Sequence, residues 1–167
     1  MALLPILEYP DPRLKKVAAA VTDFTPDVVR LVRDMAETMY AAPGIGLAAT
    51  QVDVHKRIIV IDTSDARDDL VVLVNPEIIS ASGEIECEEG CLSVPGYYDK
   101  VVRAARITVR ARTEHGEAFE RTAEDMLAVC MQHEMDHLVG RMFVDYLSPL
   151  KRARLKQKQR KKQRLAG

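Results

Sequence analysis

Several residue types and patterns are missing from this chain of 167 residues. It has no tryptophan and only three phenylalanines, so aliphatic side chains and methionine must fill any hydrophobic core. It has no apolar run long enough to cross a membrane, and its amino terminus lacks the basic segment and long apolar run of a secretory signal. We therefore expect a cytoplasmic protein that has no membrane partner.

Cysteine is also scarce, with three residues at Cys87, Cys91 and Cys130. An odd number of cysteines does not indicate a disulfide framework, and free thiols are typical of a reducing compartment. With 47% hydrophobic residues and the usual length of one domain, the chain is expected to fold as a single domain.

The formal net charge of −1 hides an uneven distribution of charge. Residues 151–164 carry nine of the 24 Lys and Arg residues and no acid, which leaves 15 basic against 25 acidic residues elsewhere. An acidic body with a basic tail suggests that the tail has an anionic partner of its own, although such tails can also serve only solubility. DNA is not an expected partner.

Two kinds of hydrophobic period predict the elements. Thr25-Pro26-Asp27 combines a capping hydroxyl, a proline and an acid at the positive end of the helix dipole, and apolar residues follow at helical spacing. Asp11-Pro12 predicts a shorter helix before it. The helical period predicts helices over 26–41 and 123–138, and runs rich in Val and Ile predict strands over 57–62, 70–74, 97–112 and 118–122.

This order of elements indicates an α+β fold. We predict a single domain in which mostly antiparallel sheets pack around a central helix, with N-terminal helices and a C-terminal helix. Residues 1–147 are expected to form the catalytic part, and residues 148–167 a basic tail that is helical.

The predicted central helix carries His133-Glu134-Met135-Asp136-His137, an HExxH motif. Two histidines four residues apart face the same side of a helix, so both rings can bind one metal ion. Glu134 projects about 100° around the axis, where it can reach a water on that metal. Val129 and Cys130 share the histidine face one turn earlier, where they either line a pocket beside the metal or pack the core.

A catalytic metal centre needs three protein ligands and one open position. Only 30 residues follow His137, and Asp145 is the sole acid among them, without any His or Cys. The third ligand must therefore be Asp145 or lie upstream. Cys91 is the best upstream candidate, because its thiolate is a strong anionic donor and the adjacent Gly90 lets the backbone approach closely.

Three segments together resemble the signature blocks of bacterial peptide deformylases. They are Gly44-Ile45-Gly46-Leu47-Ala48-Ala49-Thr50-Gln51, Glu89-Gly90-Cys91-Leu92-Ser93-Val94-Pro95 and the HExxH region 132–140. Their order and separation match as well, and the resemblance extends from Tyr9 to Leu150. Three independent blocks are far harder to match by chance than one.

The resemblance implies a role for each matching residue. Cys91, His133 and His137 would bind the metal, and Glu134 would be the catalytic acid and base. The Gln51 amide and the backbone N–H of Leu92 would hold the oxyanion. The positions that it places around the substrate are Gly44, Ile45, Gly46, Gly90, Val129, Cys130 and Tyr98.

The implied activity is removal of the N-formyl group from the N-terminal methionine of new polypeptides, with release of formate. The implied cofactor is one divalent ion, ferrous iron in the cell, with zinc, nickel or cobalt able to occupy the site. The tail would then contact ribosomal RNA. Two alternatives stay open: an HExxH metallopeptidase that cleaves internal peptide bonds, and a non-catalytic, metal-stabilised module that binds ribosomes.

Overall fold

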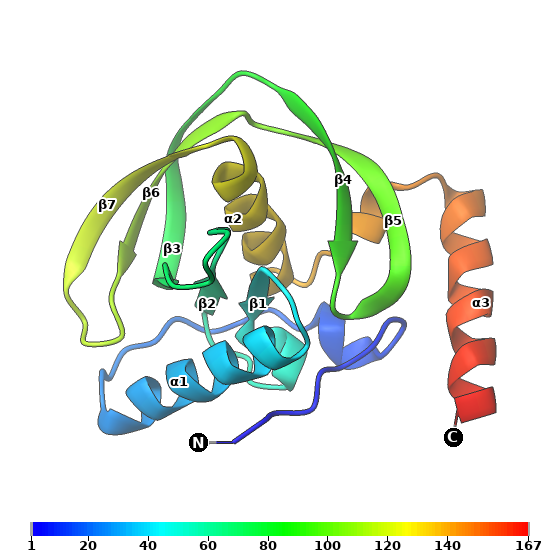
Figure 1. Ribbon diagram of the computed structural model, residues 1–167, viewed down its shortest axis with the longest axis horizontal. Coiled ribbons are helices and arrows are strands. Elements are labelled where there is room, and N and C mark those ends of the chain that lie inside the picture. The colour runs from blue at the N-terminus through cyan, green and yellow to red at the C-terminus, as the bar shows by residue number, and fades with distance from the viewer. Residues whose placement is uncertain (1, 167) are drawn as a thin grey trace.

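The computed structural model describes residues 2–166, so Met1 and Gly167, the outer limits of the two predicted parts of the chain, lie outside the described residues. Its centre is helix α2 (Asp125–Leu138), which lies between two antiparallel sheets (Figure 1). The larger sheet has the strand order β1-β2-β3-β6-β7, with bounds Gly46–Ala48, Ile58–Ile61, Val71–Ser82, Arg106–Arg112 and Ala118–Glu124. The smaller sheet pairs β4 (Ile85–Cys91) with β5 (Val94–Arg103). The predicted α+β fold is confirmed.

Helix α1 (Pro26–Ala41) has the predicted bounds. Its apolar residues recur at helical spacing, and Val28, Val32, Met35 and Met39 are buried against the larger sheet. The Thr25 hydroxyl makes no capping hydrogen bond, so that part of the prediction is wrong and Pro26 and Asp27 carry the start of the helix. The shorter predicted helix is a single 3-10 turn, η1 (Pro12–Lys15).

The predicted strand over 97–112 is wrong as one element, because the chain changes sheets within it. β5 ends at Arg103 and pairs with β4, whereas β6 starts at Arg106 and pairs with β3 and β7. β3 likewise extends past the predicted end at Val74 and leads into β4, which was not predicted. Gly83, with a φ of 68°, turns the chain there, and its carbonyl accepts a hydrogen bond from Ala105 N.

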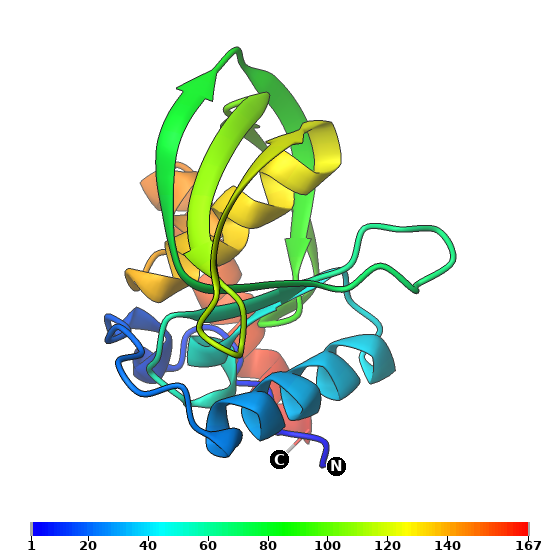
Figure 2. The ribbon, with the colours of Figure 1, turned by 90° about the vertical axis from the view of Figure 1, so that its left-hand side faces the viewer.

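These two sheet-to-sheet connections form adjacent arches over one end of α2 (Figure 1, and from the side in Figure 2). The arches bring Cys91, at the end of β4, to the same side of α2 as the free edge of β1. Because sheets cover two sides of α2, most of the helix is buried, and Met131 and Leu138 are fully enclosed in the main core. Each such side chain contributes about 1.5–3 kcal/mol on burial.

The tail forms helix α3 (Pro149–Ala166), the C-terminal helix of the predicted fold. Only Leu155 and Gln159 of this helix are buried, and Gln163 donates a hydrogen bond to the carbonyl of Tyr9 at 3.1 Å. The helix therefore packs along one edge of the body and leaves most of its charge exposed. Within residues 2–166, no helix has both the length and the apolar character needed to span a membrane.

Candidate metal centre and substrate cleft

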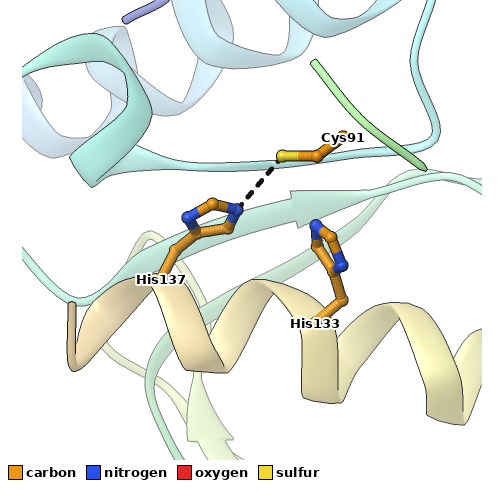
Figure 3. Close-up of side chains that lie close together, drawn as sticks. All are labelled: Cys91, His133 and His137. Atoms are coloured by element: carbon orange, nitrogen blue, oxygen red, sulfur yellow. Dashed lines mark hydrogen bonds between the residues drawn. The ribbon is translucent and has the colours of Figure 1, made fainter. Parts of the chain in front are cut away.

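Cys91, His133 and His137 converge between α2 and the end of β4 (Figure 3). One ligand atom from each residue lies within 4.8 Å of the other two, and Cys91 Sγ is 3.4 Å from His137 Nε2. Both histidine side chains are buried, on the same face of α2, because they are one helical turn apart. Of the two third ligands that remained open from the motif alone, the fold brings Cys91 to the histidines.

The separation between the sulfur of Cys91 and Nε2 of His137 fits a metal ion. A tetrahedral metal bonded to sulfur at about 2.3 Å and to nitrogen at about 2.1 Å would set the two donors about 3.6 Å apart. The Cys91–His137 separation of 3.4 Å is close to that value. One thiolate and two imidazoles are donors that suit transition metals, and three protein ligands leave a fourth position open for catalysis.

A buried carboxylate orients the His133 ring. Glu89 Oε1 lies 2.8 Å from His133 Nδ1, which leaves Nε2 of the ring directed toward Cys91 and His137. Arg103 holds Glu89 with two parallel hydrogen bonds, at 2.8 and 2.9 Å. Burial raises the pKa of Glu89, but the hydrogen bonds from Arg103 and His133 outweigh it, so the net pKa is lowered and the carboxylate stays ionised.

The electrostatic surroundings of the two histidines differ. Burial lowers the pKa of His133, but the Glu134 charge and hydrogen bonds with Cys91 and Glu89 outweigh it, so the net pKa is raised well above the usual value. Burial and the neighbouring His133 lower the pKa of His137 well below the usual value, which favours the neutral, metal-binding form.

Gln51 lies beside the Cys91 thiol. It belongs to a 3-10 turn, η2 (Ala49–Val52), and its Oε1 accepts a hydrogen bond from Ala48 N at 2.9 Å. Its Nε2 donates to Ser93 Oγ at 3.0 Å and to Cys91 Sγ at the longer distance of 3.5 Å. The amide is thus fixed beside the sulfur with one weakly held N–H.

Glu134 has a buried carboxylate whose Oε1 has no hydrogen-bond partner among the described residues. Its Oε2 lies 4.0 Å from His133 Nε2, and a Cβ placed on Gly46 would come within 2.5 Å of the same oxygen. Only glycine allows β1 to pass this close to the carboxylate. Burial raises the pKa of Glu134 to about 7, so the group can both accept and donate a proton near neutral pH.

A cleft of about 870 Å³ opens onto this centre. Cys91, Leu92, His133 and Glu134 line the cleft. It is also lined by every residue that was predicted to surround the substrate: Gly44, Ile45, Gly46, Gly90, Val129, Cys130 and Tyr98. Gln51 and His137 lie behind the lining instead. The Tyr98 ring covers Gly90, where an added Cβ would meet it at 2.4 Å, and the Leu92 side chain covers Gly44.

A comparison with protein families identifies this arrangement. Residues 3–153 match the family model described as polypeptide deformylase, which is most of the chain. The chain belongs to the polypeptide deformylase family. These enzymes remove the N-formyl group from the N-terminal methionine of new polypeptides, so the predicted family, its metal-dependent hydrolase chemistry and its activity are confirmed.

Individual deformylases are similar over nearly the full length. Peptide deformylase 2 of Nitrosomonas europaea is 62% identical, over 98% of this chain and 89% of its own. A crystal structure of a peptide deformylase from Legionella pneumophila is 51% identical, with a TM-score of 0.93 over 98% of this chain and 97% of that one. The deformylase of Ehrlichia chaffeensis in complex with actinonin is 41% identical, with a TM-score of 0.95 over 98% and 99% of the two chains.

The motif analysis missed the residues behind the deformylase site. The motifs assign no role to Glu89, which contacts His133, or to Ser93, which accepts a hydrogen bond from Gln51. Residues two apart on a strand point to the same face, so Glu89 and Cys91 would have been linked if the strand over 85–91 had been predicted. Arg103 also forms a salt bridge with Asp136 of α2 at 2.6 Å.

Proposed function

We propose that Cys91, His133 and His137 together hold the one divalent metal ion of this enzyme, and that this ion is ferrous iron in the cell. The convergence of their three ligand atoms beside the free oxygen of Glu134 carries the proposal. Zinc, nickel or cobalt would fit the same donors. When bound, the ion supplies Lewis acidity, which acidifies a water molecule and polarises the formyl carbonyl.

Glu134 would move the proton. Its carboxylate takes a proton from the attacking water and returns it to the amine nitrogen as the C–N bond to the formyl carbon breaks. A pKa of about 7 suits both halves of this transfer, because the group is neither a very weak base nor a very weak acid. Its unpartnered Oε1 leaves one oxygen available for that proton.

The Gln51 amide and the Leu92 backbone N–H would stabilise the charge that develops on the formyl oxygen. Gln51 is already held beside the thiolate by Ala48 and Ser93, so little reorganisation is needed. Only its 3.5 Å contact with Cys91 has to be exchanged for the substrate oxygen. A single donor of this kind is typically worth about 3–4 kcal/mol in the transition state.

The substrate would lie between two free strand edges. Among residues 2–166, β1 pairs only with β2 and β4 pairs only with β5, so each has an edge free. Gly44–Gly46 and Gly90 line the cleft. Hydrogen bonds to a peptide backbone suit substrates of many sequences. Val129 and Cys130 of α2 would receive the methionine side chain, with Tyr98 at the rim.

Glu134→Gln tests the assignment. We expect the variant to retain its metal but to lose about 10²–10⁴-fold in turnover of formyl-Met peptides, because only the proton transfer is removed. Glu86→Gln is the matched control, since Glu86 is an exposed carboxylate of β4 outside the cleft lining. Formate release near the wild-type rate in Glu134→Gln would refute the role of Glu134.

The two alternatives predict other results. A metallopeptidase would cleave internal bonds of unformylated peptides, which we expect to remain intact. A non-catalytic module would release no formate from formyl-Met peptides even when fully loaded with metal. Metal analysis on protein prepared without oxygen would identify the ion, since an iron-bound thiolate beside an open position is prone to oxidation.

Residues 1–147 would form the catalytic part, and the tail 148–167 would dock on ribosomal RNA, in the cytoplasm where new chains emerge. α3 supports this because its basic residues are mostly exposed, including Arg154, Lys158 and Lys161 on one side of the helix. Contacts between such residues and phosphates make binding strongly dependent on salt.

Two kinds of variant test the tail. Arg154→Gln/Lys158→Gln/Lys161→Gln should weaken ribosome binding and flatten its salt dependence, and removal of all residues after Leu147 should abolish binding. Lys15→Gln/Arg33→Gln/Lys100→Gln removes the same charge from exposed positions on the body and is the control. Equal ribosome affinity of the truncated and full-length proteins in sedimentation assays would exclude the tail as the segment that binds the ribosome.

A further inference from the structure

A short 3-10 turn, η3 (Phe143–Tyr146), contacts the surroundings of His133 along two routes. The Phe143 ring packs against the His133 ring, with their centroids 5.9 Å apart. Tyr146, at the other end of η3, reaches the same histidine through a series of polar contacts. η3 lies between the central helix and α3, so it is well placed to hold one side of the metal centre.

The polar contacts run without a gap. The Tyr146 hydroxyl donates to Asp136 Oδ2 at 2.9 Å, and Arg103 Nη1 donates to the same oxygen at 2.6 Å. The other side of the guanidinium holds Glu89, whose Oε1 contacts His133 Nδ1. The side chains of Arg103 and Glu89 are each only 5% exposed, so water has little access to the middle of the series.

The geometry of Arg103 and the exposure of Asp136 make this series of contacts sensitive to the loss of the Tyr146 hydroxyl. A guanidinium is planar, so the direction in which Asp136 holds one nitrogen also sets the plane in which Glu89 is held. Asp136 is the most exposed member apart from Tyr146, with 17% of its side chain accessible. Without the phenol hydroxyl, its carboxylate is free to turn toward water, and the guanidinium then loses a fixed partner.

We propose that Tyr146 is a positioning residue for the metal centre, acting on the His133 ring through Asp136, Arg103 and Glu89. The inference rests on the proposed function, because it assumes that His133 binds the metal. Groups that orient a metal-bound histidine tune both the affinity and the electronic properties of the metal. Tyr146 extends that control to the turn that leads into α3.

The phenol is suited to this role. Burial and the neighbouring Asp136 raise the pKa of Tyr146, so its hydroxyl remains a donor throughout the neutral range. The Arg103 guanidinium also lies over the Tyr146 ring, 5.1 Å from its centroid. Tyr146→Phe keeps this cation–π contact and removes only the hydroxyl, so the variant tests the hydrogen bond rather than the packing.

The experiment measures the affinity of the enzyme for Co²⁺ by chelator competition, and the absorption bands of the cobalt-loaded enzyme by visible spectroscopy. We expect Tyr146→Phe to bind Co²⁺ about three- to tenfold more weakly, less than the 10–100-fold typical of direct histidine partners, and to shift the absorption bands of the metal. Asp136→Asn should change both readouts in the same direction and by more. Tyr97→Phe is the control, because its hydroxyl donates to Asp99 at 2.7 Å and takes no part in this series.

The possible results distinguish a failure of the Tyr146 positioning role from a failure of the proposed metal site. Unchanged affinity and spectrum in Tyr146→Phe, with wild-type protein binding one Co²⁺, would overturn the inference and leave the proposed function standing. A wild-type protein without stoichiometric Co²⁺ binding would refute the proposed metal site itself. Equal shifts in Tyr146→Phe and Tyr97→Phe would show a general effect of losing a hydroxyl, and would also overturn the positioning role.

Discussion

The close approach of β1 to the Glu134 carboxylate, the proposed acid and base, gives a sharp prediction for Gly46→Ala. The added Cβ would stand 2.5 Å from Glu134 Oε2, whereas ordinary van der Waals contact begins near 3.4 Å. The carboxylate or the strand must therefore move by about 0.9 Å. A misplacement of about 1 Å in a reacting group typically costs about 10²-fold in rate, or about 2.7 kcal/mol in the activation barrier.

We expect Gly46→Ala to bind its metal normally and to lose about 10²-fold in kcat for formate release. The protein should stay folded, because Gly46 is not among the described glycines with a positive φ and alanine tolerates its backbone. Gly44→Ala is the matched comparison, because its Cβ would press on the flexible end of Leu92 instead and should act mainly on KM. A kcat within about threefold of wild type in Gly46→Ala would show that the carboxylate position is not critical.

Two further predictions concern the loop between β2 and β3, which projects from the body (Figure 2). Arg67 donates hydrogen bonds to the carbonyl of Gly44 in the cleft wall and to Asp62 O at 2.7 Å. Arg67→Ala should therefore lose about 1 kcal/mol of substrate binding, which raises KM about fivefold and leaves kcat near wild type. A fall in kcat alone would contradict this. Burial raises the pKa of Asp62, but hydrogen bonds from Ser64, Tyr40 and Asp69 N lower it to about 2. Because the folded-state pKa is below the unfolded value, the ionised form stabilises the protein above about pH 4, and this stability is lost as the pH falls toward 2. Urea unfolding should therefore show Asp62→Asn destabilised at pH 7 and closer to wild type at pH 3, and an equal difference at both pH values would contradict the assignment.

Local patterns predicted the elements whose residues are stabilised by near neighbours. α1 follows from a proline, an acid and a row of apolar residues at helical spacing, all within one segment. The two histidines share a face for the same reason, since a helix fixes residues four apart. The three motif blocks, compared with a known family, then placed Cys91, Gln51 and Glu134 in one site.

Long-range contacts decided what these patterns could not. The strand over 85–91 is mostly polar and acidic, and it forms because β5 pairs with it after the chain has passed over α2. The break between Arg103 and Arg106 likewise follows from pairing with two different sheets. Neither feature has a strong local signal.

The sequence by itself determined the helix with its two candidate histidine ligands, because these depend on residue types at a fixed short spacing. The three motif blocks indicated the family and Cys91 through their resemblance to its signature segments. Only the tertiary structure decided which groups stand behind the ligands. Glu89, Arg103, Asp136 and Tyr146 come from strand, helix and turn, and buried charges of this kind persist only where the fold brings their partners within hydrogen-bond distance. That requirement links residues 89 to 146 through space, which no spacing along the chain could specify.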